Sequence, residues 1–242
     1  MLSRNEVKYI QTLRHKKNRD EENVFVAEGV KIAGELLQSG FNIQKIYAVK
    51  SWIDQHPGLK NVVEVSENEL KRISNFETPN KIVAIVEKNR SVQIPSLKGK
   101  ITLMLDGIQD PGNLGTIIRT ADWFGIENII ASNDTADLYN PKVIQSTMGS
   151  FARVNVLYTG LSTFLSGNNI TVIGATLDGD NVSAIKKMNE CIIIIGNEGK
   201  GIRKEIEPFV QKKISIPKTG NAESLNAAVA TGILLFQLKL AT

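Results

Sequence analysis

The sequence predicts an α/β protein in two parts, a small N-terminal α/β domain followed by a larger α/β domain with a mainly parallel sheet. Residues 101–217 alternate continuous apolar segments with helical ones, which is typical of strands covered on both faces. Residues 24–86 hold shorter strands and helices of their own. The segment 87–100 is polar without sustained periodicity, as linkers are. We therefore expect an N-terminal domain at 1–90, a linker at 91–99 and a C-terminal domain at 100–242.

The N-terminal elements follow from apolar spacing and capping residues. Residues 3–18 repeat Val7, Ile10 and Leu13 at helical spacing, which predicts one amphipathic helix with a basic outer face. A second helix ends at Gly40, a typical C-cap, and a third begins at Ser66 with Glu69 three residues later. Between and around them we expect strands at 24–27, 43–49, 62–65 and 82–86 and helices at 29–39 and 66–74.

The C-terminal part alternates strand and helix patterns from Ile101 onward. In such sheets ligands lie outside the carboxyl ends of the strands, so the loops there are the places to look for chemistry. The expected strands are 101–106, 128–132, 153–158, 170–176, 191–196 and 212–217, and the expected helices are 114–124, 141–148, one near Leu161, 203–209 and 224–239.

The composition excludes several classes of protein. With 42% hydrophobic and 22% charged residues over 242 positions, the chain is typical of a folded, water-soluble protein. The lone Cys191 excludes a disulfide framework and a cysteine-based zinc site, and indicates a reducing compartment. No apolar run reaches the length of a membrane span and the N-terminus lacks a signal-peptide pattern, so we expect a cytoplasmic protein. We expect no metal, and we interpret His15, His56 and Cys191 as structural.

The net charge of +4 is unevenly distributed. Residues 1–99 contain 16 Lys and Arg against 12 Asp and Glu, whereas residues 100–242 contain 13 of each. Such a cluster suits a polyanion, although most charge clusters are solvated faces. The residues that could bind a nucleic acid here are the six cations of the first segment, namely Arg4, Lys8, Arg14, Lys16, Lys17 and Arg19.

The first candidate loop is 106–119, DGIQDPGNLGTIIR, which joins an apolar strand to a helix. Pro111 and Gly112 predict a turn, Asn113 is a candidate helix cap, and Arg119 lies one and a half turns into a largely apolar helix. Taken alone, this loop is better explained as a capped helix with a surface arginine than as a functional site.

The second candidate loop is 191–202, CIIIIGNEGKGI, where a buried strand runs into closely spaced glycines. The spacing matches neither GxxxxGK followed by Ser or Thr nor GxGxxG, and a tight connection would explain the glycines. Glu198 is harder to explain structurally, because a carboxylate between glycines suits an orienting or proton-accepting role.

The third candidate loop is 214–230, ISIPKTGNAESLNAAVA, which ends in an alanine-rich helix. Ser224 is placed to cap that helix, and the small residues permit close approach of another backbone or subunit. A cap on a close-packed core helix explains the pattern except for Asn226 in the first turn.

Together the three loops resemble the motifs of the SpoU or TrmH-like branch of the SPOUT RNA ribose 2′-O-methyltransferases. The resemblance rests on N-x-G-x-x-x-R-T-A at 113–121, IIIIGNEGKGI at 192–202, and IP at 216–217 followed by ESLNAAVA at 223–230. It covers about 140 residues. Separately, VFVAEGVKIAGELL at 24–37 looks like the start of the substrate-binding domain, similar in fold to a ribosomal protein, that precedes the catalytic domain in many members.

The resemblance implies a fold, a cofactor and partners. The C-terminal part would form a deep trefoil knot, an exception to the usual absence of knots. It would bind S-adenosylmethionine, and homodimers would complete each active site across the interface. The partner would be structured RNA, most simply ribosomal RNA. The cofactor-binding residues that the resemblance implies are Thr176, Gly196, Asn197, Gly201, Ile216, Ser224 and Leu225.

The implied reaction transfers a methyl group from a sulfonium to a ribose 2′-hydroxyl, so the developing alkoxide must be stabilised. The family's motif suggests Arg119 for this task. Its guanidinium pKa above 12 makes literal proton abstraction unsuitable, so we interpret it as an electrostatic clamp. Glu198 is then the candidate to hold Arg119 or accept a proton. The residues expected to position the ribose and the loops are Asn113, Ser224 and Asn226.

Several alternatives stay open at this point. A non-catalytic RNA-binding or ribosome-associated protein would have the same basic N-terminal domain. An ordinary nucleotide-dependent α/β enzyme would explain the sheet and the glycines. Within the preferred class the substrate is ribosomal RNA, for housekeeping or for antibiotic self-protection, or else tRNA, and the two-domain layout favours large-subunit ribosomal RNA only by analogy.

Overall fold

The computed structural model describes residues 2–89 and 96–240, and they divide into two units. One unit contains residues 2–89 together with 137–152, and the other contains 96–136 together with 153–240. Residues 91–95 of the expected linker lie outside the described residues. The segment 137–152 was expected in the C-terminal domain, yet it groups with the N-terminal unit.

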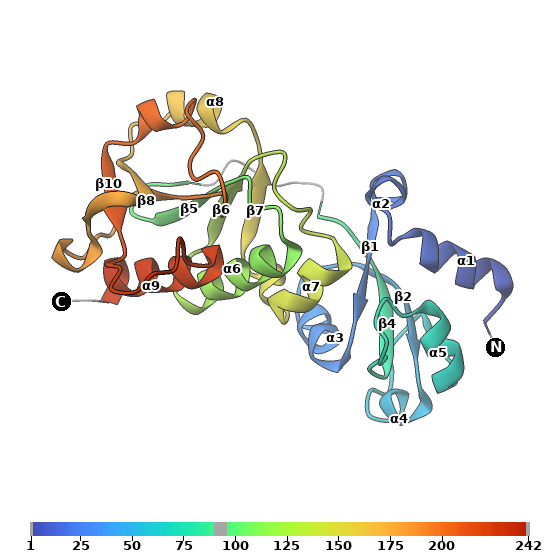
Figure 1. The fold of residues 1–242 in the computed structure, drawn as a ribbon. Coiled ribbons are helices and arrows are strands. Elements are labelled where there is room, and N and C mark those ends of the chain that lie inside the picture. Colours follow the sequence, from blue (N-terminus) through green and yellow to red (C-terminus); the bar gives the residue numbers. More distant parts are fainter. Residues whose placement is uncertain (1, 90–95, 241–242) are drawn as a thin grey trace. The chain divides into compact units, whose positions relative to one another are not determined.

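The N-terminal unit is built on a four-stranded mixed sheet in the order β1-β4-β2-β3. Figure 1 labels β1, β4 and β2 of this sheet. β4 pairs antiparallel with both β1 and β2, and β2 pairs parallel with β3. Ser3 and Ser66 each begin a helix with a reciprocal capping pair, which confirms the pair predicted at Ser66 and Glu69. The elements are α1 (Arg4–Thr12), α2 (Lys16–Glu22), β1 (Val24–Glu28), α3 (Val30–Leu37), β2 (Ile43–Ala48), α4 (Lys50–Ile53), β3 (Val62–Glu64), α5 (Glu67–Ile73) and β4 (Ile82–Glu87).

The helix expected at 3–18 is divided into α1 and α2. Side chains from α2 take up the carbonyl groups at the end of α1, which would otherwise lack partners. Asn18 donates to the carbonyl of Thr12 at 2.8 Å, and the Arg19 guanidinium donates to those of Leu13 and Arg14 at 2.9 and 2.8 Å. The apolar spacing predicted the buried face of α1, but it does not reveal these bonds between side chain and backbone.

The segment 137–152 forms α7 (Pro141–Thr147) and a 3-10 turn (Ser150–Ala152), and it packs on β1. An aromatic cluster makes the contact. The Phe25 ring lies 4.7 Å from that of Tyr139 and 5.8 Å from that of Phe151, and Phe41 lies 5.7 Å from Phe151, all between ring centroids. The N-terminal unit therefore completes its core with residues taken from the C-terminal half of the sequence.

The second unit has a six-stranded sheet in the order β10-β8-β9-β5-β6-β7, and every pairing is parallel. This confirms the parallel sheet that the buried apolar runs predict. Strand order and connection do not by themselves display the trefoil knot, which stays a prediction. The elements are β5 (Ile101–Asp106), α6 (Pro111–Trp123), β6 (Asn128–Ala131), β7 (Asn155–Tyr158), α8 (Leu161–Ser166), β8 (Val172–Asn181), a 3-10 turn (Val182–Ala184), β9 (Cys191–Gly196), a 3-10 turn (Glu207–Phe209), β10 (Lys212–Ser215) and α9 (Ala227–Leu240).

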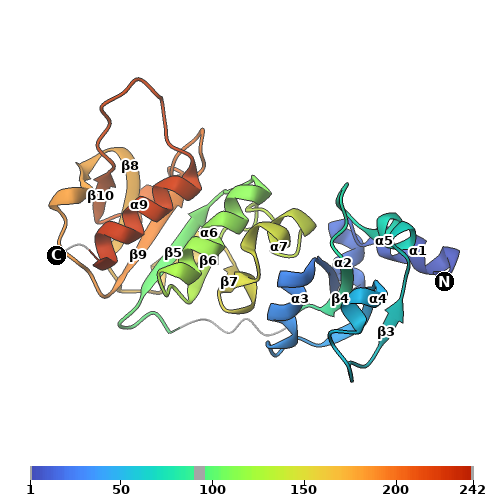
Figure 2. The ribbon, with the colours of Figure 1, turned by 90° about the horizontal axis from the view of Figure 1, so that it is seen from below.

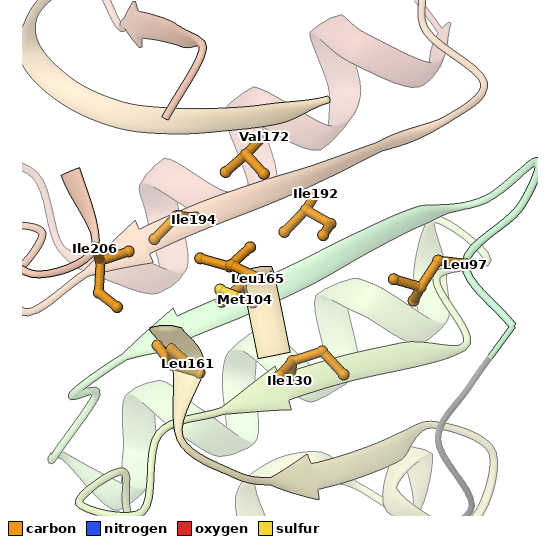
Figure 3. Packing of buried hydrophobic residues seen from close by; sticks show 9 residues of the cluster. All are labelled: Leu97, Met104, Ile130, Leu161, Leu165, Val172, Ile192, Ile194 and Ile206. Carbon is orange, nitrogen blue, oxygen red and sulfur yellow. The ribbon is translucent and has the colours of Figure 1, made fainter. Parts of the chain in front are cut away.

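Helices cover both faces of this sheet. α6 and α9 pack side by side on one face, while α8 lies on the other (Figures 1 and 2). Beneath α8 the central strands contribute a buried apolar cluster (Figure 3). Burial raises the pKa of Cys191 on β9 to about 12, so its thiol is a neutral core group. The cluster consists of Leu97, Met104, Ile130, Leu161, Leu165, Val172, Ile192, Ile194 and Ile206.

In the second unit, three of the expected helices differ from the structure. No α-helix covers 203–209, where only the 3-10 turn forms. α6 begins at Pro111 because Asp110, not Asn113, is its N-cap and accepts the Asn113 N–H at 2.8 Å. α9 begins at Ala227 rather than Ser224, with Asn226 in the capping role.

Candidate functional site

The site begins where two neighbouring parallel strands end. Asp106, the last residue of β5, is paired with Gly196, the last residue of β9. Because parallel strands place their carboxyl ends at one edge of the sheet, the loops that follow β5 and β9 emerge side by side. The first and second candidate loops of the sequence therefore meet in space.

The loop after β9 folds back on itself as a narrow turn. The backbones of Asn197 and Gly201 exchange two hydrogen bonds, at 3.0 and 2.8 Å. A Cβ atom on Gly196 would lie 2.4 Å from the carbonyl carbon of Gly201, so only glycine permits this approach, and Gly201 itself has a φ of +68°. The Asn197 side chain donates to the carbonyl of Gly107 at 2.8 Å, which attaches the turn to the end of β5.

Three of the predicted catalytic residues form one chain of hydrogen bonds. Asn113 donates through Nδ2 to Oε1 of Glu198 at 2.6 Å, and Asn226 donates through Nδ2 to Oδ1 of Asn113 at 2.8 Å. Oδ1 of Asn226 accepts the N–H groups of Ala228 and Val229 at the start of α9. The two amides are thereby fixed in orientation, and the three candidate loops are joined through these side chains.

Arg119 lies apart from this chain. It is exposed on α6, and among the residues that the structure describes its guanidinium makes no ion pair. The expected contact between Glu198 and Arg119 is absent from the described part of the chain, where Glu198 is held by Asn113 instead. On the helix, Arg119 shares its exposed face with Trp123, four residues later.

Beside the hydrogen-bonded chain lies a cavity of about 660 Å³, within the usual range of small-molecule sites. Its lining includes apolar side chains, among them Ile202, Ile214 and Leu234, and polar or charged ones such as Glu198. Every residue that the family resemblance assigned to the cofactor lines this cavity, namely Thr176, Gly196, Asn197, Gly201, Ile216, Ser224 and Leu225. Ser224 is exposed in the loop and does not cap α9, so its expected capping role is wrong.

The cavity fits S-adenosylmethionine chemically. An adenine ring needs apolar contacts, and exposed backbone groups of a glycine turn suit its polar edges and ribose. The Glu198 carboxylate at the rim favours the positive charge of a sulfonium. The absence of a Cβ at Gly196 keeps the turn closed against Ile202 and so preserves the shape of this part of the lining.

The predicted RNA-binding cations differ among themselves in the structure. Arg4 and Lys8 are exposed on α1. Arg14 donates to the carbonyl of Ser74 at 2.7 Å, and Lys16 and Lys17 pair with acidic residues one helical turn later on α2.

The prediction that Arg19 contacts RNA is wrong, because its side chain is buried. Its side chain is 2% exposed, and Nη2 lies 2.5 Å from Oδ2 of Asp137. Together with its bonds to the end of α1, this pair makes Arg19 a structural residue of the N-terminal unit. The count of charges in the first segment includes Arg19 among the candidate contacts, because its partner Asp137 lies 118 positions away in the sequence and does not enter such a count.

Sequence reasoning missed Asp106 and Arg203. The Asp106 side chain is fully buried and accepts from the Arg203 backbone N–H and guanidinium. A carboxylate that ends a continuous apolar strand is a detectable signal, since buried charges need partners. Arg203 carries no such signal, because the helix expected at 203–209 gives no indication that Arg203 lies beside Asp106 at the end of β5.

Among the residues that the structure describes, no group of three or more His, Cys, Asp or Glu side chains is arranged to hold a metal ion. No helix within 2–89 and 96–240 is long and apolar enough to cross a bilayer.

Curated relatives and solved structures resemble this chain over nearly its whole length. The Bacillus subtilis 23S rRNA (guanosine(2553)-2′-O)-methyltransferase RlmP is 31% identical, covering 96% of this chain and 95% of that protein. The Coxiella burnetii 23S rRNA (guanosine-2′-O-)-methyltransferase RlmB is 30% identical, covering 86% and 92%. An rRNA methyltransferase from Sinorhizobium meliloti, solved with S-adenosylmethionine bound, superposes with a TM-score of 0.86 at 32% identity, covering 98% of this chain and 95% of that one.

A protein assigned to the TrmH family of RNA methyltransferases, from Porphyromonas gingivalis, superposes with a TM-score of 0.88 at 34% identity and covers both chains completely. Two family models match separate parts of the sequence. Residues 4–84 match the MRM3-like substrate binding domain, and residues 100–236 match the SpoU rRNA methylase family. With more than half of its residues in the second match and full-length relatives of the same kind, the chain belongs to the SpoU rRNA methylase family.

Proposed function

We propose that this protein transfers the methyl group of S-adenosylmethionine to the 2′-hydroxyl of a ribose in large-subunit ribosomal RNA. The observation that carries the proposal is the hydrogen-bonded chain from Glu198 through Asn113 to Asn226 at the rim of the cavity, in a member of the SpoU family. The relatives RlmP and RlmB act on guanosines of 23S rRNA, which favours ribosomal RNA over tRNA. A cytoplasmic location is part of the same proposal, because the proposed substrate is ribosomal RNA and Cys191 is a free, buried thiol.

The reacting hydroxyl must lose its proton while its oxygen attacks carbon. When bound, S-adenosylmethionine supplies a methyl group already activated by positive sulfur. Oε1 of Glu198 is occupied by the Asn113 amide, which leaves Oε2 to accept the hydroxyl proton directly or through water. Asn226 holds Asn113 in the orientation that this requires, and Arg119 stabilises the negative charge that develops on the oxygen.

Arg119 does not line the cavity of its own chain, so we propose that a second copy completes the site. The exposed side of α9 carries Val229, Ile233, Phe236 and Leu240 at spacings of four, three and four, which forms an apolar stripe. Trp123 extends it at the end of α6, four residues from Arg119. A symmetric dimer through α6 and α9 would cover this stripe and carry each Arg119 toward the partner's cavity.

Complementation between two inactive variants tests the shared site. Arg119→Ala and Glu198→Ala each remove one half of the machinery. If the halves come from different chains, mixing and re-equilibrating the two variants in equal amounts makes half of the dimers mixed, each with one intact site. About one quarter of the wild-type activity should return. No recovery, with mixed dimers verified by tagged pull-down, would place both residues in one chain's site.

The N-terminal unit is proposed to hold the RNA. Its match to a substrate-binding domain and the exposed Arg4 and Lys8 support this role. Phosphate contacts of this kind weaken as salt is added.

Mapping 2′-O-methyl groups on total RNA from cells with and without this protein tests the activity and the target together. Loss of one methyl group in large-subunit ribosomal RNA, restored by the wild-type gene and not by Arg119→Ala, is the expected result. A site lost only from tRNA would overturn the proposed substrate. An unchanged map, with the protein shown to be expressed, would overturn the activity.

A further inference from the structure

We propose that Arg203 is a positioning residue which, through Asp106, fixes the turn 197–203 and therefore the Glu198 carboxylate. The task of Glu198 rests on the proposed function, whereas the attachment of the turn does not. Neither Asp106 nor Arg203 lines the cavity.

Asp106 receives hydrogen bonds on both carboxylate oxygens from Arg203. Oδ2 accepts the backbone N–H of Arg203 at 2.8 Å, and Oδ1 accepts Nε at 2.5 Å, with Nη2 also 2.5 Å away. The Asp106 side chain is 0% exposed, whereas that of Arg203 is 37% exposed. A buried carboxylate held in this way specifies a geometry more than it stabilises a fold, because its desolvation offsets much of the attraction.

The turn is attached on both sides of Glu198 to two consecutive residues. Before Glu198, the Asn197 side chain donates to the carbonyl of Gly107. After it, Arg203 donates to Asp106. Both ends of the turn are thus fixed to the last residue of β5 and its neighbour, and Glu198 lies between these two attachments in the sequence.

The partner of Glu198 is Asn113, in the first turn of α6. Asn113 follows Gly107 by six residues on the same β5–α6 connection, and its amide meets Glu198 at 2.6 Å. The partner of Glu198 and the anchors of its turn therefore belong to one segment, so a shift of the turn relative to β5 changes the distance between the Glu198 carboxylate and the Asn113 amide directly.

Arg203 also reaches the next strand end. Its Nη2 lies 3.5 Å from Oδ1 of Asp134, which follows β6. Asp134 itself lies beside Gly107, where an added Cβ would be 3.4 Å from its Oδ2. One guanidinium thereby connects the loops after β9, β5 and β6, which are adjacent in the sheet.

The test compares Arg203→Met and Arg203→Lys with the matched control Arg153→Met. Arg153 also forms an arginine–aspartate pair in this unit, with Asp122 at 2.8 and 3.0 Å, but it does not touch the turn. Three measurements are made well below the melting temperature of each variant: the Kd of S-adenosylmethionine by calorimetry, amide hydrogen exchange across 197–203, and kcat and KM for RNA.

For Arg203→Met we expect a Kd for S-adenosylmethionine raised by about 10-fold or more, because the turn forms one wall of the cavity, and a kcat lowered by about 10- to 100-fold. The KM for RNA should stay unchanged. Exchange at residues 199–201 should accelerate while β5 and β9 remain protected. Arg203→Lys keeps the charge and one donor and should lie between wild type and Arg203→Met, and Arg153→Met should match wild type in all three measurements.

Two results would overturn the proposal. The first is a folded Arg203→Met protein with wild-type cofactor affinity and wild-type exchange in the turn. The second is loss of stability with unchanged Kd and kcat per folded molecule, which assigns Arg203 a structural role only. If Arg203→Met does not fold, the same criteria apply to Arg203→Lys. A wild-type protein that binds S-adenosylmethionine but methylates no RNA refutes the proposed function, and the binding and exchange results still decide the role of Arg203.

Discussion

Two arginines have surroundings in the structure that are the opposite of what their neighbours in the sequence suggest. Arg19 belongs to a basic cluster, yet it is buried in the N-terminal unit against Asp137 and the end of α1. Arg119 lies in a mainly apolar helix, yet it is exposed and has no ion pair within the described residues. A local charge cluster is therefore weak evidence for a binding role, because long-range partners decide whether a cation is free.

The position of a loop at a strand end is stronger evidence. Asn113, Glu198 and Asn226 come from three loops spread over more than a hundred residues, and the parallel sheet brings them into one chain of hydrogen bonds. The carboxyl ends of parallel strands must share an edge, so the fold class predicts this meeting. The basic cluster has no comparable constraint on where its side chains point.

The largest expected effect concerns Arg19. Arg19→Met keeps the apolar stem but leaves Asp137 and the carbonyls of Leu13 and Arg14 without their donor. We expect the free energy of unfolding to fall by about 3–5 kcal/mol, the usual result of breaking a buried pair. Urea denaturation followed by circular dichroism measures it.

The exposed Lys8→Met is the matched control and should change stability by less than about 0.5 kcal/mol. Arg19→Met should also leave kcat per folded molecule unchanged. If its stability matched that of the control, the contrast between the two arginines would be lost.

The next effect concerns Arg119. Arg119→Ala should lower kcat by at least about 100-fold, because one fixed charge beside the developing oxyanion is lost. The melting temperature and the Kd of S-adenosylmethionine should stay near wild type, since the side chain is exposed and outside the cavity lining. The exposed Lys187→Ala, in the same unit, provides the control. A wild-type rate of RNA methylation by Arg119→Ala would remove Arg119 from the reaction.

The elements of the fold could largely be predicted, whereas several side-chain roles could not. Apolar runs such as 191–196 predicted buried parallel strands, because both faces of such strands must be covered. Ser224 and Asn226 are both good capping residues, and only the path of the loop decides that Asn226 caps α9. The helix expected at 203–209 does not form, and Arg203 is instead bonded to the buried Asp106, a long-range partner that periodicity does not include.

The segment 137–152 shows the same limit at the level of domains. Its helix α7 was expected at 141–148, and that expectation is confirmed. Its place in the N-terminal unit depends on Tyr139 and Phe151 meeting Phe25, a contact between residues more than a hundred positions apart. Deleting residues 1–95 would expose these rings, so point substitutions test RNA binding more cleanly than that truncation.

The smallest expected effect concerns the ion pair between Lys45 and Glu6 in the N-terminal unit, where a partly exposed cation also has a structural role. Lys45 lies 2.7 Å from Glu6, and this contact, with hydrogen bonds from Ser3, lowers the pKa of Glu6 from 4.5 to about 2. The Glu6 carboxyl therefore binds a proton less readily in the folded protein than in the unfolded chain. The resulting stability is fully present above pH 4.5 and is lost as the pH falls toward 2.

Glu6→Gln removes the charge but keeps a side chain that can still cap α1. Because the pair is partly exposed, we expect the free energy of unfolding at pH 7 to fall by about 1 kcal/mol or less. The difference from wild type should shrink between pH 4.5 and pH 2, as measured by urea denaturation at several pH values. Glu64→Gln on β3, an exposed position, should show no such trend. A difference independent of pH would mean that packing, rather than the charge, makes Glu6 stabilising.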